Sequence, residues 1–112
     1  MNDTQSGGSN LTAPNAVSDT FNISKNKDHT FIYTVTAIET NVVVRPQGSQ
    51  DGTNWYHLDD SQIDTTITAN GTYMDHKSNF AGHLARILFV SESGGTAVVV
   101  ATKYTGGKRP NG

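Results

Sequence analysis

Residues 29–39 read HTFIYTVTAIE, and this stretch decides the fold class. One face carries Phe31, Tyr33 and Val35, while the residues between them lie on the opposite face. This alternation has the two-residue period of a β-strand rather than the 3.6-residue period of a helix. Most side chains in the stretch are β-branched or aromatic, and such residues favour extended backbone. The stretch is therefore predicted to form a strand.

Similar patterns occur along the rest of the chain. The other predicted strands cover residues 17–23, 41–47, 55–58, 63–69, 72–74, 83–90 and 96–104. Pro46 cannot donate a backbone hydrogen bond, so it belongs at a strand end, a bulge or an edge. Asn70 and Gly71 predict a type I′ hairpin turn. The sequence predicts an all-β fold: an antiparallel, jelly-roll-like β-sandwich of seven or eight short strands.

Length and composition narrow the functional classes. The chain has 112 residues, which is the size of one domain. Its net charge is −2 and its basic residues are scattered, so we expect no nucleic-acid partner. The absence of cysteine excludes disulfides and thiolate metal sites. No apolar run approaches the roughly 20 residues of a membrane span, so we expect no membrane partner.

The two ends of the chain are polar. Residues 1–16 contain Leu11 as their only large apolar side chain after the initiator, and residues 105–112 are rich in glycine. Such segments bury too little apolar surface to offset the entropy of ordering. We therefore expect a flexible N-terminal arm over 1–16, a β-sandwich domain over 17–104 and a flexible C-terminal tail over 105–112.

The stretch HLARILFV at residues 83–90 is apolar on both faces. Ile87 and Phe89 lie on one face, and Leu84 and Leu88 lie on the other. An antiparallel sheet usually leaves one face polar and wet. We expect the second apolar face to be covered either by the N-terminal segment or by another protein surface.

The stretch GSQDGTNW at residues 48–55 contains the single tryptophan of the chain. Asp51 and Gly52 predict a tight turn in which glycine supplies a positive φ and the aspartate side chain bonds backbone amides. Trp55 then begins the next strand. Two interpretations stay open: a buried tryptophan beside a turn, or an exposed platform for a sugar ring.

The ionisable residues match no metal or catalytic pattern. Aspartates that could offer oxygen to calcium occur at Asp51, Asp59, Asp60 and Asp64, but their spacing does not fit an EF-hand loop. The histidines, His29, His57, His76 and His83, have no zinc-site spacing. No nucleophile elbow or phosphate-binding loop is present. The sequence therefore predicts no enzyme, no metal and no cofactor.

Three segments together resemble a group of small virion proteins of tailed bacteriophages. They are VVVRPQGSQDGTNWYHL at 42–58, LARILFV at 84–90 and GGTAVVVATKY at 94–104. The shared motif is Gly-Ser-x-Asp-Gly-x-x-Trp, and the resemblance covers about residues 30–104. It implies a β-sandwich on the phage particle, most often a head decoration (cement) protein and sometimes a tail or neck component.

A decoration protein would dock on the lattice of the major capsid protein and stabilise the head. It would lie on the outer surface of the capsid, after a period in the host cytoplasm before assembly. Its partners would be the major capsid protein and neighbouring copies of itself, with a homotrimer expected. The residues expected at this interface are Leu11, Ile87, Phe89 and Tyr104.

The motif also allows a second hypothesis, because its core occurs in discoidin-like carbohydrate-binding sandwiches. A domain of that class would bind surface glycans. The ligand rim would then contain Asp51, Trp55 and Tyr56.

Overall fold

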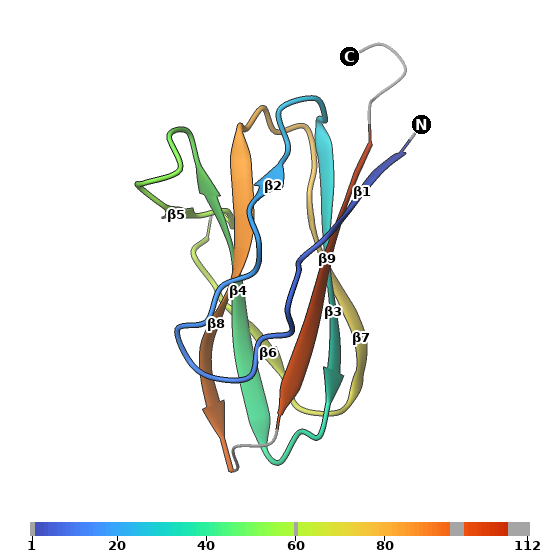
Figure 1. Ribbon diagram of the computed structural model, residues 1–112, viewed down its shortest axis with the longest axis vertical. Coiled ribbons are helices and arrows are strands. Elements are labelled where there is room, and N and C mark those ends of the chain that lie inside the picture. Colours follow the sequence, from blue (N-terminus) through green and yellow to red (C-terminus); the bar gives the residue numbers. More distant parts are fainter. Residues whose placement is uncertain (1, 60, 95–97, 108–112) are drawn as a thin grey trace.

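The computed structural model describes residues 2–59, 61–94 and 98–107, with side chains from residue 4 onward. Within these residues there are nine strands, in two antiparallel sheets that pack face to face (Figure 1). Their bounds are β1 (Asn2–Ser6), β2 (Phe21–Asn22), β3 (Asp28–Thr36), β4 (Asn41–Ser49), β5 (Tyr56–His57), β6 (Thr65–Ile67), β7 (Gly71–Lys77), β8 (Leu84–Ser93) and β9 (Val99–Gly107). The predicted antiparallel β-sandwich is confirmed.

Sheet A has the strand order β1-β9-β3-β7, and sheet B has the order β2-β8-β4-β5, with β6 also paired to β4. Strands that follow one another in sequence usually lie in different sheets. The link from β3 to β4 crosses between the sheets, and so do the links from β6 to β7 and from β7 to β8. Each crossing carries the chain over the end of the sandwich, so the two sheets are tied together along the whole sequence.

The prediction of a type I′ hairpin at Asn70 and Gly71 is wrong. The strand before the turn, β6, pairs with β4 in sheet B, while β7 pairs with β3 in sheet A. Gly71 has a positive φ, but Asn70 does not. The Asn70 side chain instead accepts the backbone N–H of Ile38 at 3.0 Å. The Asn-Gly turn signal is present in the sequence, but the strands on its two sides belong to different sheets. Ile67 packs into the core from sheet B, and Tyr73 packs against it from sheet A.

The core lies between the sheets and follows the predicted alternation. Phe31, Tyr33 and Val35 of β3 point inward and are at most 1% exposed. The inner faces of β4 and β8 meet them, through side chains that include Val44 and Phe89. Burial of these apolar side chains supplies most of the stabilisation, at about 25 cal/mol per Å² of apolar surface removed from water.

Residues 2–16 differ from the flexible arm that the sequence predicted. β1 pairs with β9 along its length, and Leu11 forms a bridge with Val100 and is only 3% exposed. Further on, Asn15 N–H donates to the carbonyl of Phe89 at 2.8 Å. The segment thus runs from the edge of sheet A to the edge of sheet B and covers that side of the sandwich (Figure 1). Backbone hydrogen bonds hold a polar segment here, and Leu11 anchors it in the core.

The predicted C-terminal tail began at Thr105. Thr105 belongs to β9, which continues to Gly107 and pairs with both β1 and β3. Residues 108–112 lie outside the described residues. None of the described residues forms a helix that is long and apolar enough to cross a membrane.

Candidate functional site

The turn at Asp51 forms as the sequence predicted. The Asp51 carboxylate accepts the backbone N–H of Asn54 at 2.9 Å and that of Thr53 at 2.8 Å, and it also accepts the Asn54 side-chain amide at 2.9 Å. Gly52 has a φ of 79°. These hydrogen bonds, first of all the one from the Asn54 backbone, hold the pKa of Asp51 well below its usual range. The carboxylate is therefore engaged in holding the turn.

Trp55 lies on the outer face of sheet B, where it stacks on Arg86. The guanidinium carbon of Arg86 is 4.1 Å from the centroid of the indole ring. Arg86 Nε donates to Oε1 of Gln47, its neighbour across the strand pair, at 2.8 Å. Trp55 is half-buried, so the structure supports neither a core tryptophan nor a fully open platform. One face of the indole ring is covered by the arginine.

Tyr56 does not join this cluster. Tyr56 pairs with Gly48, whereas Arg86, on which Trp55 stacks, pairs with Gln47. Adjacent residues of β4 point to opposite faces, so Tyr56 lies on the face opposite Arg86. Its ring packs over Gly48, where a Cβ atom would come within 2.8 Å of it. Gln50 donates to the Tyr56 hydroxyl at 3.3 Å, and Tyr56 is 38% exposed. Two residues of the expected sugar rim, Trp55 and Tyr56, therefore lie on different faces.

All four residues expected at a subunit interface lie in the core. Leu11 is 3% exposed, and Ile87, Phe89 and Tyr104 are fully buried. Alternation correctly grouped Ile87 with Phe89, but both faces of β8 are apolar, so the sequence did not show which face points inward. The outward face carries Leu84, Arg86 and Leu88.

A second polar network lies on the outer face of sheet B. Arg45 binds both carboxylate oxygens of Asp64, at 2.7 and 3.0 Å. The same carboxylate accepts Nε2–H of His57 at 2.8 Å, while Nδ1 of His57 accepts the backbone N–H of Asp59 at 3.2 Å. The hydrogen bond to Arg45 lowers the pKa of Asp64, and Asp64 in turn raises the pKa of Arg45. The network anchors the loop after β5 to β4.

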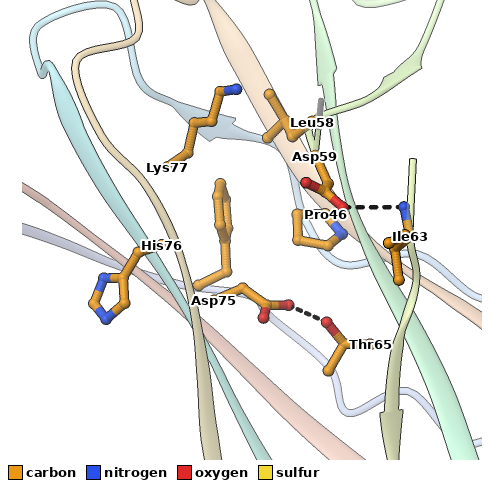
Figure 2. A pocket seen from close by; sticks show the side chains of 9 residues that line it. Pro46, Leu58, Asp59, Ile63, Thr65, Asp75, His76 and Lys77 are labelled. Carbon is orange, nitrogen blue, oxygen red and sulfur yellow. Dashed lines mark hydrogen bonds between the residues drawn. The ribbon is translucent and has the colours of Figure 1, made fainter. Parts of the chain in front are cut away.

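A cavity of about 220 Å³ opens at the edge of the sandwich, between β7 and the segment from β5 to β6 (Figure 2). Its floor is apolar and consists of Phe31, Pro46 and Leu58. Ile63 stands at the rim and is 69% exposed. Figure 2 shows the His76 ring pointing away from the cavity.

The two carboxylates at this cavity accept hydrogen bonds from the surrounding backbone and side chains. Asp59 accepts the backbone N–H of Ile63 at 3.0 Å. Oδ2 of Asp75 accepts the hydroxyl of Tyr33 at 2.9 Å and also the hydroxyl of Thr65 (Figure 2). Asp75 therefore ties β7 in sheet A to β6 in sheet B.

The remaining ionisable residues are dispersed. His29 is buried, while His76 and His83 are exposed. Among the described residues, no three histidine or carboxylate side chains are placed to hold a metal ion. Asp60 lies outside the described residues. Sequence reasoning missed Arg86 and Gln47, although an arginine inside an apolar strand was a visible signal.

Comparisons with known proteins show a shared fold. Neither the models of known families nor the curated protein sequences match this chain. Among solved structures, the crystal structure of the SPBc2 prophage-derived protein YomS matches with a TM-score of 0.65. The match covers 95% of this chain and 92% of that chain, at 11% sequence identity. The two proteins therefore share a fold over nearly their whole lengths.

Proposed function

We propose that this protein is a non-enzymatic structural protein of a tailed-phage particle, and specifically a decoration protein that docks on the major capsid protein lattice. The observation that carries the proposal is the fold shared over 95% of the chain with a prophage-derived protein. The motif at residues 48–55, which resembles that of small phage virion proteins, also supports the proposal.

The side-chain chemistry also favours a structural role. The carboxylates of Asp59, Asp64 and Asp75 are each bound by backbone or side-chain donors that hold the sandwich together. A general acid or base must reach a substrate proton, whereas each of these carboxylates accepts hydrogen bonds from groups of the chain itself.

The stabilising effect would come from linkage. A rigid sandwich that binds the capsid lattice only when the lattice is assembled stabilises the assembled state in proportion to its binding free energy. The surface used must be exposed, so docking is assigned to outer sheet faces and not to the buried Ile87 and Phe89. A trimer of this chain remains part of the proposal, and light scattering of the purified protein measures it.

The test is the copy number of the protein in purified phage particles, measured by quantitative mass spectrometry against the major capsid protein. A decoration protein is expected at a copy number comparable with that of the major capsid protein. A copy number far below that value would assign the protein to the neck or tail. Absence from the particle would overturn the proposal.

Glycan binding is the second candidate function, and the exposed ring of Tyr56 beside Gln50 favours it. The engaged carboxylate of Asp51 and the stacked Trp55 oppose it. A glycan array with the wild-type protein and Tyr56→Ala tests it. Binding that is lost in Tyr56→Ala would support a glycan-binding rim, while an array without signal would exclude one for the glycans on it.

A further inference from the structure

The two outer faces of the sandwich differ in chemistry. The outer face of sheet A carries hydroxyl groups that bond across neighbouring strands. Thr34 and Thr72 are 3.2 Å apart, and Thr30 lies 2.9 Å from Nδ1 of His76. This face also carries apolar side chains, namely exposed Met74 and the half-buried Ile32, Val99 and Ala101. Its paired hydroxyls are already bonded within the sheet and gain little from docking.

The outer face of sheet B carries apolar side chains along β8, beside the polar Arg45 and Gln47 of β4. Leu84 and Leu88 point outward from β8 and are half-buried, and Val43 points outward from β4 opposite Ser91. Val17 pairs with Leu88 at the strand edge and is 40% exposed. The N-terminal segment lies beside β8 in the plane of the sheet, so it extends this face without covering it.

Arg86 stands between Leu84 and Leu88 on this face. Its Nε atom is held by Gln47 and its guanidinium plane is stacked on Trp55, so its orientation is fixed. Its two terminal nitrogens make no hydrogen bond to any residue that the structure describes, and no described carboxylate forms an ion pair with it. Burial without a countercharge lowers its pKa.

Arg45 on the same sheet shows the contrast. It binds the Asp64 carboxylate with two hydrogen bonds, so its charge is already neutralised within the chain. Arg86 presents the same planar pair of donors, but its countercharge is not among the described side chains. A half-buried arginine held in one orientation is matched to a carboxylate supplied from outside.

We propose that the outer face of sheet B docks on a protein surface that places an aspartate or glutamate carboxylate against Arg86, with apolar side chains around it. This inference rests on the proposed function and names the contact by which the protein would bind the particle. The positive charge of Arg86 favours an acidic partner group. The apolar side chains of Leu84, Leu88 and Val17 favour apolar side chains around that group. Tryptophan and arginine are the residue types that most often dominate binding free energy at interfaces.

The experiment measures binding to heads purified from particles that lack this protein, by co-sedimentation over a range of protein concentrations. The variants are Arg86→Gln, Arg86→Lys and Trp55→Ala. Lys103→Gln is the matched control, because it removes one positive charge from the outer face of sheet A. Each variant is first shown to unfold cooperatively in the temperature range of the wild-type protein.

We expect Arg86→Gln to weaken binding at least about tenfold, since an interfacial charge then loses its partner. Arg86→Lys should restore only part of the affinity, because an ammonium group lacks the planar pair of donors. Lys103→Gln should bind as the wild-type protein does. Hydroxyl-radical footprinting of the bound protein should show protection of Trp55.

Three results would overturn the inference, and they are distinguishable from one another. If the wild-type protein binds heads and Arg86→Gln binds equally well, the docking face is wrong while the decoration function stands. If the wild-type protein does not bind heads, the proposed function and this inference both fail. Weaker binding of Lys103→Gln than of Arg86→Gln would assign docking to sheet A instead.

Discussion

The hydroxyl of Tyr104 lies 2.6 Å from Nδ1 of His29 inside the sandwich. The other ring nitrogen, Nε2, lies 2.9 Å from the carbonyl oxygen of Phe80, and a carbonyl can only accept. Nε2 therefore carries the hydrogen, and Nδ1 accepts the hydroxyl hydrogen of Tyr104. The network fits a neutral imidazole, and burial lowers the pKa of His29.

This arrangement predicts that the free energy of unfolding falls at mildly acidic pH. The pKa of His29 in the folded protein lies below its ordinary value of 6.5, so the unfolded chain binds the proton first as the pH falls. The contribution of neutral His29 to the free energy of unfolding is therefore complete above about pH 6.5 and is lost progressively below it. Urea denaturation at a series of pH values between 8 and 4.5 measures the effect.

The control variants separate His29 from the other histidines. His29→Phe should be less stable at neutral pH but should lose less additional stability as the pH falls. His83→Gln removes an exposed histidine and should keep the wild-type pH dependence. If the free energy of unfolding of His29→Phe falls with pH as steeply as that of the wild-type protein, His29 is not the group responsible.

Asp75 should be coupled energetically to Tyr33. Replacing Asp75 with alanine leaves the buried Tyr33 hydroxyl without its acceptor and should lower the free energy of unfolding by about 1–3 kcal/mol. In a Tyr33→Phe background the same replacement should cost clearly less, because no hydroxyl then needs an acceptor. A double-mutant cycle by chemical denaturation gives the coupling, and a coupling of zero would refute the contact.

Thr102 should tolerate replacement by valine with a gain in stability. Its Oγ1 atom is buried and has no hydrogen-bond partner among the described residues. Valine has nearly the same shape and removes the unpaired hydroxyl, so Thr102→Val should raise the free energy of unfolding by about 1 kcal/mol. Thr105→Val, at an outward position that bonds Thr4, should show no such gain. Differential scanning calorimetry measures both variants. A lower melting temperature for Thr102→Val would contradict a buried hydroxyl without a hydrogen-bond partner at this position.

Leu11 should contribute to the core although it lies in a polar segment. Leu11→Ala should lower the free energy of unfolding by about 2–5 kcal/mol, as expected for a buried leucine. Val17→Ala, at an exposed position just after this segment, should change it by less than about 0.5 kcal/mol. If Leu11→Ala is as stable as the wild-type protein, Leu11 is not held in the core, and the flexible arm that the sequence predicted describes this segment better.

These contacts show what local sequence patterns can and cannot predict. The strand around Phe31 and the turn at Asp51 were predicted because alternation and turn chemistry act within a few residues. The partner of each strand is decided elsewhere in the chain, so the signal at Asn70 and Gly71 could not show that β6 and β7 join different sheets. The ordering of β1 was missed for the same reason, since it depends on the free edge of β9.

The candidate site was only partly predictable. The motif located Trp55, but its stacking partner Arg86 comes from a distant strand, and single-sequence patterns do not show such pairs. Alternation placed Ile87 and Phe89 on one face of β8 and Leu84 and Leu88 on the other. Because both faces are apolar, the choice of the inner face needed the packing of the whole sandwich.

The most direct measurement is a cryo-electron microscopy reconstruction of the purified phage particle that contains this protein. The predicted result is density for the sandwich at repeated positions on the outer surface of the capsid, with sheet B toward the capsid and Arg86 beside a carboxylate. Density only at the neck or tail, or a capsid surface without the sandwich, would contradict the decoration function.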